Sequence, residues 1–444
     1  MRRLLANGWI VTMDDAGTEH DSGWVLVDGS TVAAVGGGPA PEADEVVELG
    51  GAVVTPGLVN THHHLFQTLT RARAQDADLF TWLRELYPVW AGLDEEAEHA
   101  AARCGLAELA RSGCSTVFDH HYLFPRGTSG LVEAEVRAAR EIGVRIVASR
   151  GSMDLGESAG GLPPDSVVED LDAVLAETER LAAAVHEAGV GAMTQIAVAP
   201  CSPFSVTKRL MVESAALARR LGLQLHTHLA ETVEEDAYCQ ELYGCTPVEY
   251  LAELGWTAAD VWCAHCVHLS DADVRTFADA GVGVAHCPTS NLRLGAGVAP
   301  VRELVDAGVR VGLGVDGSAS NERSDLFHEV KQALLVARGR GGPEAMTCRD
   351  ALRLATRGGA AVLSREDIGS IEAGKCADLA VWRTDGLELG GAEDRVAGLV
   401  LSGPHRVDRL LVGGEDVVRE GQLVRVEEDD IAREHRLQAS RFAP

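Results

Sequence analysis

Residues 51–64 read Gly-Ala-Val-Val-Thr-Pro-Gly-Leu-Val-Asn-Thr-His-His-His, a short apolar run that ends in three consecutive histidines. Side chains alternate across a β-strand, so His62 and His64 share one face while His63 points to the other. Two imidazoles are thereby aimed at a common point, an arrangement typical of a metal site. Such a pair is weak evidence alone, because histidines at strand ends more often make ordinary hydrogen bonds.

Further polar side chains close other apolar runs. Residues 223–231, Leu-Gln-Leu-His-Thr-His-Leu-Ala-Glu, end in two histidines and a glutamate, and residues 309–316 end in an aspartate. Two more runs each end in a histidine. Polar groups at so many strand ends are hard to explain by chance. They are His226, His228, Glu231, His265, His286 and Asp316.

From about residue 94 to residue 340 the chain alternates between helical patterns and apolar strands, and a glycine precedes most strands, as expected of a helix C-cap. Eight such units predict an α/β fold, a closed (β/α)8 TIM-like barrel whose polar strand ends converge. An open doubly wound sheet would hold the first, fifth and eighth strands too far apart to share a metal. The predicted strand ends lie near Asn60, His120, Arg150, Pro200, His228, Cys266, Cys287 and Asp316.

The two ends of the chain have a different pattern, with short alternating runs separated by turn residues. We therefore expect a small composite β-sandwich built from residues 1–54 and 367–426, beside a barrel of residues 55–366. The charged segment 427–444 predicts a terminal helix or tail that covers the edge of the sandwich.

The composition excludes several classes of protein. Lys+Arg 39 against Asp+Glu 67 gives a formal net charge of -28, which repels the phosphates of nucleic acids and of anionic lipids. No apolar run approaches the roughly 20 residues that span a bilayer, and the N-terminus lacks a signal peptide. The 10 cysteines are irregularly spaced, mostly in apolar runs, as in a reducing compartment. We expect a cytoplasmic protein with neither a nucleic-acid nor a membrane partner.

The strand-end residues suit one catalytic metal. Three neutral imidazoles and one carboxylate bind Zn²⁺ or Fe²⁺ and leave a position for water, whose pKa falls toward about 7 on the metal. Residues 197–202, Ala-Val-Ala-Pro-Cys-Ser, offer no lysine for a carbamate between two metals. We expect one divalent metal per chain, zinc rather than iron. The predicted ligands are His62, His64, His228 and Asp316.

The remaining polar residues receive other roles. Glu231 lies close enough to the metal-bound water to carry its proton to a substrate nitrogen. His265 is expected to polarise or orient the nucleophile, and Asp316 to take the remaining proton. His226 is interpreted as a partner of a ligand and His63 as a core residue. The other histidines, His120, His121, His268 and His286, are interpreted as residues of the barrel mouth. Of these, His120 and His121 follow the second strand and could line the pocket.

Five segments together resemble the amidohydrolase superfamily in its mononuclear metal-dependent aminohydrolase branch. They are residues 56–64, 226–232, 264–269, 286–291 and 314–321. The resemblance covers nearly the whole chain, including the composite β-sandwich. It implies the same four metal ligands, and it implies that the glutamate after the fifth strand and the histidine of the sixth strand are catalytic.

Within that branch, residues 64–69, 107–116 and 150–157 are most similar to 8-oxoguanine deaminases and to s-triazine hydrolases. The resemblance implies conversion of 8-oxoguanine to urate and ammonia by attack of metal-bound hydroxide. The alternatives are an s-triazine amino- or chlorohydrolase of the hydroxyatrazine type, or a guanine, isocytosine or pterin deaminase. A barrel without chemistry is disfavoured, because an idle site has no physical reason to keep this costly polar cluster.

Several residues are candidates for binding the heterocycle. Guanine deaminases place a glutamine three residues after the second metal histidine, and Gln67 occupies that position. Trp82 could stack on a flat ring, as could Tyr87 and Trp90, although core packing is the commoner fate of such aromatics. His121 and Arg150 complete the predicted contacts. We also expect a homo-oligomer, a dimer or larger.

Overall fold

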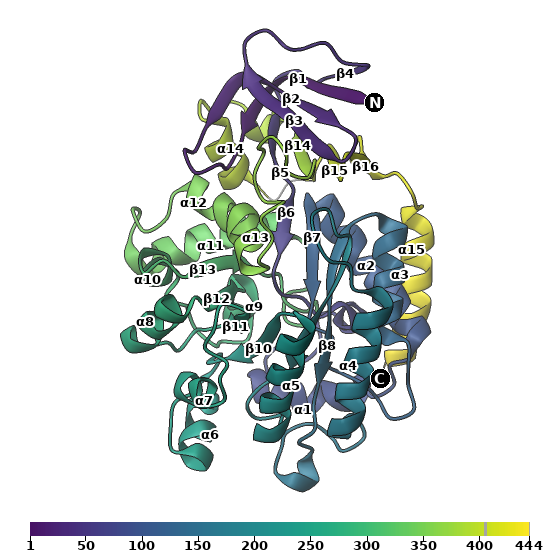
Figure 1. Ribbon diagram of the computed structural model, residues 1–444, viewed down its shortest axis with the longest axis vertical. Helices are drawn as coiled ribbons and strands as arrows, with labels where there is room; N and C mark the ends of the chain where they lie inside the picture. Colours follow the sequence, from purple (N-terminus) through teal and green to yellow (C-terminus); the bar gives the residue numbers. More distant parts are fainter. Residues whose placement is uncertain (404–405, 444) are drawn as a thin grey trace.

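Eight parallel strands close into a barrel in the computed structural model, which describes residues 1–403 and 406–443. The last strand pairs with the first through Leu313 and Asn60, so the sheet has no open edge. This closure confirms the predicted (β/α)8 fold (Figure 1). The strands are β6 (Leu58–Asn60), β7 (Cys114–Asp119), β8 (Arg145–Ser152), β9 (Thr194–Pro200), β10 (Leu225–Leu229), β11 (Val261–His265), β12 (Gly283–His286) and β13 (Arg310–Leu313).

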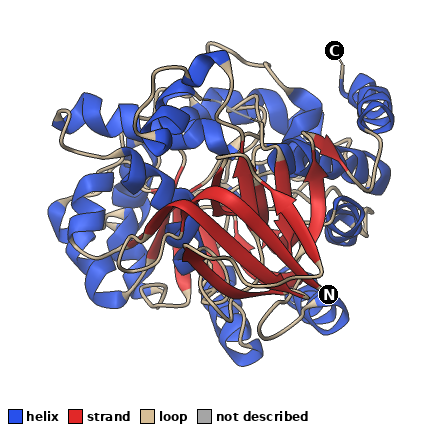
Figure 2. Ribbon diagram, turned by 90° about the horizontal axis from the view of Figure 1, so that it is seen from above, coloured by secondary structure: helices blue, strands red, loops and turns tan. Residues whose placement is uncertain are grey.

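Helices surround the strands (Figure 2). Asp94 caps the helix α2 (Glu95–Arg111), whose first turn carries three glutamates that offset the helix dipole. Gly222 ends α5 (Lys208–Leu221) with a φ of 69°, which residues with a Cβ rarely adopt. The others are α1 (Leu79–Trp90), α3 (Leu131–Ile142), α4 (Leu171–Val185), α6 (Val233–Tyr243), α7 (Pro247–Glu253), α8 (Asp271–Ala280), α9 (Pro288–Arg293), α10 (Val301–Asp306), α11 (Leu326–Gly341), α12 (Cys348–Arg353), α13 (Gly359–Val362) and α14 (Arg395–Ser402).

Strands from both ends of the chain join in one nine-stranded sheet beyond one end of the barrel (Figure 1). β5 (Val53–Pro56) pairs antiparallel with β14 (Leu379–Trp382), so the strands of the two ends of the chain join in one hydrogen-bonded sheet, as the predicted composite β-sandwich requires. Apolar side chains from both segments form its own core. The remaining strands are β1 (Arg2–Val11), β2 (Glu19–Asp28), β3 (Thr31–Gly37), β4 (Glu45–Glu48), β15 (Arg409–Val412), β16 (Glu415–Arg419) and β17 (Gln422–Leu423).

The chain enters the barrel slightly after the boundary predicted at residue 54. Thr55 and Pro56 still pair with β14, and the first barrel strand begins at Leu58. Gly57 lies at the crossing, where a Cβ would come within 2.4 Å of Oγ of Ser115. A glycine is therefore needed where the chain passes from the sheet to the barrel.

The predicted terminal helix is present as α15 (Glu428–Ala439), but it does not chiefly cover the edge of the terminal sheet. It packs mainly against α2 on the side of the barrel (Figure 1). Its glutamates Glu428 and Glu434 pair with Arg111 and Arg103 of that helix. These ion pairs and the apolar contact of Phe442 explain why the segment lies on the barrel.

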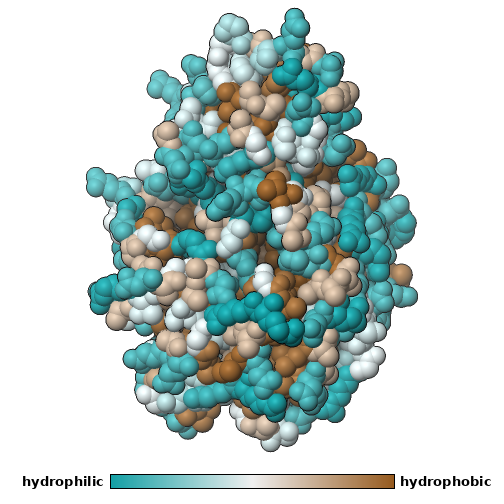
Figure 3. Space-filling view, in the orientation of Figure 1, coloured by the Kyte–Doolittle hydropathy of each residue, from teal (hydrophilic) through white to brown (hydrophobic). Residues whose placement is uncertain are grey.

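The barrel strands run away from the terminal sheet, because β6 begins directly after the sheet strand β5. Their carboxyl ends, and the residues that follow them, therefore lie at the far end of the molecule. The face seen in Figure 3 is mostly hydrophilic, with small hydrophobic areas scattered over it. Among the described helices, none combines the length and the apolar character that crossing a bilayer requires.

Candidate active site

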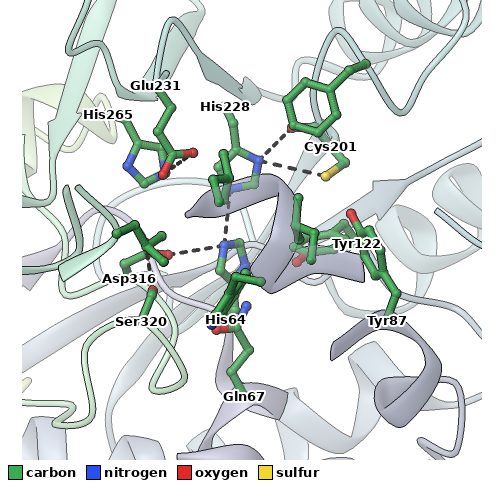
Figure 4. Close-up of a pocket in the computed structure, with 15 residues that line it drawn as sticks. His64, Gln67, Tyr87, Tyr122, Cys201, His228, Glu231, His265, Asp316 and Ser320 are labelled. Atoms are coloured by element: carbon green, nitrogen blue, oxygen red, sulfur yellow. Dashed lines mark hydrogen bonds and ion pairs between the residues drawn. The ribbon is translucent and has the colours of Figure 1, made fainter. Parts of the chain in front are cut away.

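Four of the predicted residues meet at the carboxyl end of the barrel, and Figure 4 shows three of them, His64, His228 and Asp316. His62 and His64 follow β6, His228 lies in β10, and Asp316 follows β13. Oδ1 of Asp316 is 3.4 Å from Nε2 of His62 and 3.3 Å from Nε2 of His64. Nε2 of His64 is 3.1 Å from Nε2 of His228. Closure of the barrel brings these residues of the first, fifth and eighth strands together.

The partners of two imidazoles fix the position of their protons. Nδ1 of His64 lies 2.7 Å from the carbonyl oxygen of His120, and Nδ1 of His228 lies 2.7 Å from the carbonyl oxygen of Cys201. A carbonyl can only accept, so each Nδ1 carries the proton and each Nε2 presents a lone pair. Burial lowers the pKa of both rings well below its usual value, so they remain neutral. Two lone pairs therefore face each other across 3.1 Å.

The same reasoning places a third lone pair on His62. Nδ1 of His226 donates to the carbonyl of Trp262 at 3.0 Å, so Nε2 of His226 accepts from Nδ1 of His62, also at 3.0 Å. Nε2 of His62 then carries no proton, and it is buried without a hydrogen-bond partner among the described residues. His226 thus orients a candidate ligand from behind, as a partner outside the ligand set does in metal sites.

Asp316 is held so that one oxygen faces the three imidazoles. Its Oδ2 accepts hydrogen bonds from the hydroxyls of Ser290 and Ser320, and its Oδ1 accepts the N–H of Gly317 at 2.7 Å. Three lone pairs and a carboxylate oxygen converge in a buried space, an arrangement that only a cation or added protons can neutralise. This donor set suits Zn²⁺ or Fe²⁺.

The structure adds His120 to the groups around this point. Its ring stacks on His228 with the centroids 4.6 Å apart, and its ligand nitrogen lies within 4.8 Å of those of His62, His64 and His228. Nε2 donates to the carbonyl of Ala199 at 2.9 Å, and Nδ1 has no partner. The sequence pattern indicated only a residue of the barrel mouth that could line the pocket, because the pair His120-His121 after β7 lacks the His-x-His spacing of His62 and His64.

Glu231 and His265 form a pair beside the candidate ligands. Oε2 of Glu231 is 3.5 Å from Nε2 of His265, whose Nδ1 donates to the side-chain oxygen of Asn291 at 2.9 Å. Burial raises the pKa of Glu231 to about 7. Glu235 accepts the backbone N–H of Glu231 and of Ala230 and so fixes the loop. A carboxylate of this kind can take up and release a proton near neutral pH.

A pocket opens above these residues, with polar groups at its base and apolar side chains on its walls (Figure 4). Gln67 is 1% exposed, and its side-chain oxygen has no hydrogen-bond partner. Its amide packs against Gly317, where a Cβ would lie 1.9 Å from that oxygen. The lining residues are His64, Gln67, Leu79, Trp82, Leu83, Tyr87, Tyr122, Cys201, Phe204, His228, Glu231, His265, Leu294, Asp316 and Ser320.

His121 and Arg150, predicted to contact substrate, do not line this pocket among the described residues. His121 follows an inward-facing histidine by one residue, so it points outward to Glu135. Arg150 binds the carboxylate of Glu169 at 2.8 Å and lies over the ring of Phe124. Both side chains lie outside the described lining, so the structure does not show the contact with substrate that the sequence predicts for them.

Of the other aromatic and histidine candidates, some line the pocket and the others lie outside it. Trp82 and Tyr87 line the pocket, whereas Trp90 lies behind it and donates to the hydroxyl of Thr70. His63 contacts the hydroxyl of Ser324, away from the pocket. His268 and His286 are likewise absent from the described lining. Seven further lining residues were not predicted from the sequence. Tyr122 and Cys201 closely follow the ends of β7 and β9, which was the available signal, whereas no such signal marks the residues of α1, of the α9 C-cap or of the later loops: Leu79, Leu83, Phe204, Leu294 and Ser320.

Comparisons with known proteins agree with this arrangement. The model of the amidohydrolase family matches residues 53–416. An 8-oxoguanine deaminase of Pseudomonas aeruginosa strain PAO1 is 45% identical over 428 residues, which cover 96% of this chain and 95% of that protein. An isoxanthopterin deaminase of an unknown prokaryotic organism is 37% identical, covering 98% of this chain and 95% of its own. The solved atrazine chlorohydrolase of Arthrobacter aurescens TC1 complexed with zinc has a TM-score of 0.94 at 33% identity, covering 98% of this chain and 100% of that one.

Proposed function

The chain belongs to the amidohydrolase family, and on this premise we propose that it hydrolyses 8-oxoguanine to urate and ammonia. It is a hydrolase that acts on carbon–nitrogen bonds, as its deaminase relatives are. One observation carries the substrate class: Glu231 and His265 lie beside bare imidazole nitrogens, in a pocket where the oxygen of Gln67 lacks a partner.

The residues present fit a single divalent cation in this pocket, held by His62, His64, His228 and Asp316. Zinc is the preferred ion, because three imidazoles and one carboxylate match its usual ligands and a relative was crystallised with zinc. Iron remains compatible with the same ligand types. When bound, the cation lowers the pKa of a coordinated water and polarises the carbon that is attacked.

Glu231 and Asp316 can then move the two protons of the attacking water. A new C–O bond forms at the ring carbon that bears the amine. Glu231 takes the first proton from the water and gives it to the adjacent ring nitrogen. Asp316 takes the second proton and passes it to the amine, after which the C–N bond breaks and ammonia leaves. His265, held by Asn291, orients the water and stabilises the negative charge of Glu231 before it takes up the proton and after it releases it.

Gln67 provides the recognition of the ring. Its amide can donate to a ring carbonyl and accept from a ring N–H at the same time, which matches a lactam-bearing heterocycle. Trp82 and Tyr87 contribute apolar walls for a flat ring. Tyr122 places its hydroxyl beside the Gln67 amide and completes the polar end of the pocket.

A second candidate keeps this machinery and changes the leaving group to an alkylamine or chloride on an s-triazine. The fold similarity to the atrazine chlorohydrolase favours it. The Gln67 oxygen argues against this candidate, because it has no hydrogen-bond partner among the described residues. The N–H of a purine or pterin lactam would donate to this oxygen, whereas a substituted triazine ring would leave it without a partner.

The test is a substrate screen with zinc-loaded protein that measures ammonia release and the formation of urate. The substrates are 8-oxoguanine, guanine, isocytosine, isoxanthopterin and a hydroxytriazine, with atrazine tested for chloride release. We expect the highest kcat/KM for 8-oxoguanine. The substrate assignment is abandoned if 8-oxoguanine releases no ammonia while another heterocycle turns over.

A further inference from the structure

A second group of titratable side chains lies outside the pocket, between β7 and its covering helices. Glu98 comes from α2, Glu135 from α3, and His121 follows the end of β7. All three residues are fully buried. Their ligand atoms all lie within 4.8 Å of one another, with Nδ1 of His121 2.7 Å from Oε1 of Glu135 and 3.7 Å from Oε2 of Glu98.

The protonation of His121 makes this group unfavourable without a further positive charge. Nε2 of His121 donates to the carbonyl of Leu123 at 2.9 Å, so in the neutral ring Nδ1 presents a lone pair to the two carboxyl groups. Within the described chain, Nδ1 of His121 and the four carboxyl oxygens of Glu98 and Glu135 receive no hydrogen bond from a group with a fixed proton, and the two carboxyl groups face each other. Acceptors therefore face acceptors in a dry environment, where an unpaired polar group is costly.

The surroundings do not supply the missing charge. Asp119, also fully buried, adds a third carboxyl group next to Glu135, and its Oδ2 is unpartnered too. In the described part of the chain, no lysine or arginine forms an ion pair with Glu98, Glu135 or Asp119. Arg150 lies near His121, but its guanidinium is paired with Glu169.

We propose that Glu98, Glu135 and His121 bind a second divalent cation, Zn²⁺ or Mn²⁺, at a site that is structural. One imidazole nitrogen and two carboxylate oxygens are ligands that these ions accept. The cation joins β7 to α2 and α3. Asp119 extends this link to the active site, because its Oδ1 accepts the backbone N–H of Leu65, directly after His64, at 2.7 Å.

Because the group is fully buried, we expect a bound ion to exchange slowly in the folded chain, which distinguishes it from ions attracted to the acidic surface. Burial also gives the site no path for substrate, so its role is to fix the carboxyl end of β7 and the loop that carries Gln67. The proposal is independent of the reaction proposed for the pocket.

The test counts metal in a tag-free chain whose active site is emptied by His62→Ala and His64→Ala. The protein is produced with Zn²⁺ or with Mn²⁺, dialysed against metal-free buffer and measured by elemental analysis. We expect one retained equivalent, which is lost when Glu98→Gln and Glu135→Gln are added. The matched control is Glu329→Gln, which alters another fully buried carboxylate but should leave the count unchanged.

Wild-type protein provides a second measurement that does not depend on the folding of the variants. It should hold two equivalents, one in the pocket and one at Glu98, Glu135 and His121, in place of the single equivalent expected from the sequence. In addition, the X-ray absorption spectrum of the zinc in the His62→Ala, His64→Ala chain should show one imidazole among oxygen ligands. A folded chain with the emptied active site and no retained metal would overturn the proposal, leaving shared protons to neutralise the carboxyl groups. Retained metal that survives Glu98→Gln with Glu135→Gln overturns it as well.

Discussion

His265 and Asp316 both have left-handed backbone conformations, with φ of 70° and 64°. A non-glycine residue in this region costs of the order of 1–3 kcal/mol and persists only where its surroundings hold it. Ser290 and Ser320 hold the carboxylate of Asp316, and Asn291 holds the imidazole of His265. The left-handed backbone therefore occurs at two residues whose side chains are held in place by the surrounding hydrogen bonds.

Replacing Glu231 tests the proton transfer at the scale of one residue. Glu231→Gln keeps the size of the side chain but cannot accept a proton, so turnover should fall by at least ~10²-fold. Metal content and the thermal unfolding temperature should stay close to those of wild type. Steady-state kinetics with elemental analysis on the same sample decide the point. Near-normal turnover by the metal-loaded variant would assign the proton transfer to another group.

The pH dependence of the reaction follows from the same carboxyl group. Burial raises the pKa of Glu231 to about 7, and the bound cation lowers it again. Only the ionised form accepts a proton, so kcat/KM should fall as the pH drops through this pKa, with the acidic limb below pH 7. A pH profile of wild type beside Glu231→Gln checks this, because the limb should be absent from the residual activity of the variant. A limb that persists there belongs to a different group.

Gln67 determines which ring the pocket accepts. Gln67→Leu removes the amide, so a lactam ring would bury polar groups without partners, at roughly 1–3 kcal/mol. The kcat/KM for 8-oxoguanine should therefore fall by about 10- to 100-fold, and that for a less polar triazine by much less. Both substrate classes are measured in wild type and variant. Equal losses on the two would mean that the glutamine only fills space.

The sequence could predict the residues at this site whose placement depends on the alternation of a strand. The two-residue period of a strand and the order of the strands along the chain predicted the positions of His62, His64, His228 and Asp316. The structure brings these four side chains together. Tyr122 could not be placed, because the loop after a strand has no fixed period. His121 lies outside the described lining, because one residue of register turns a side chain from the barrel axis to the helices.

At the scale of elements, the terminal helix α15 supports the wall of the pocket. Phe442, directly beyond this helix, is 5% exposed and packs in the same apolar cluster as Trp82 and Trp90. The sequence of the helix did not reveal this contact, because its charged residues dominate and its few apolar ones form no clear stripe. The docking depends on ion pairs with α2, whose partners lie more than 300 residues away in the chain.

Phe442→Ala tests whether α15 supports the pocket. Loss of this buried ring should lower the free energy of unfolding by up to about 3 kcal/mol, the lower end for a buried phenylalanine, because a chain end can relax. KM should rise more than kcat falls, since the wall is loosened and the polar groups are untouched. Leu437→Ala on the same helix is the control, because that side chain is 66% exposed. Equal effects of the two changes would contradict the argument.

For the molecule as a whole, the formal net charge of -28 and the hydrophilic face of Figure 3 describe a well-solvated surface. The predicted homo-oligomer stays a prediction. The closed barrel, the terminal sheet and their order along the chain were accessible from hydrophobic period and glycine punctuation. The exact position at which the chain passes from the sheet to the barrel, Gly57, was not accessible from the sequence, because it depends on a contact with Ser115 that only the folded structure shows.

Removal of the active-site metal should weaken the whole barrel. The ion would join residues of the first, fifth and eighth strands, and the first and eighth pair through a single register position, Leu313 with Asn60. Binding to the folded chain alone stabilises it by about 4 kcal/mol at a thousandfold excess over Kd. A chelator should therefore lower the thermal unfolding temperature, and added Zn²⁺ should restore it together with activity. The His62→Ala, His64→Ala chain lacks the pocket ion and should show a much smaller shift, because the buried ion proposed at Glu98, Glu135 and His121 stays bound in the folded chain. A shift of wild-type size in that chain would mean that the pocket ion does not stabilise the barrel.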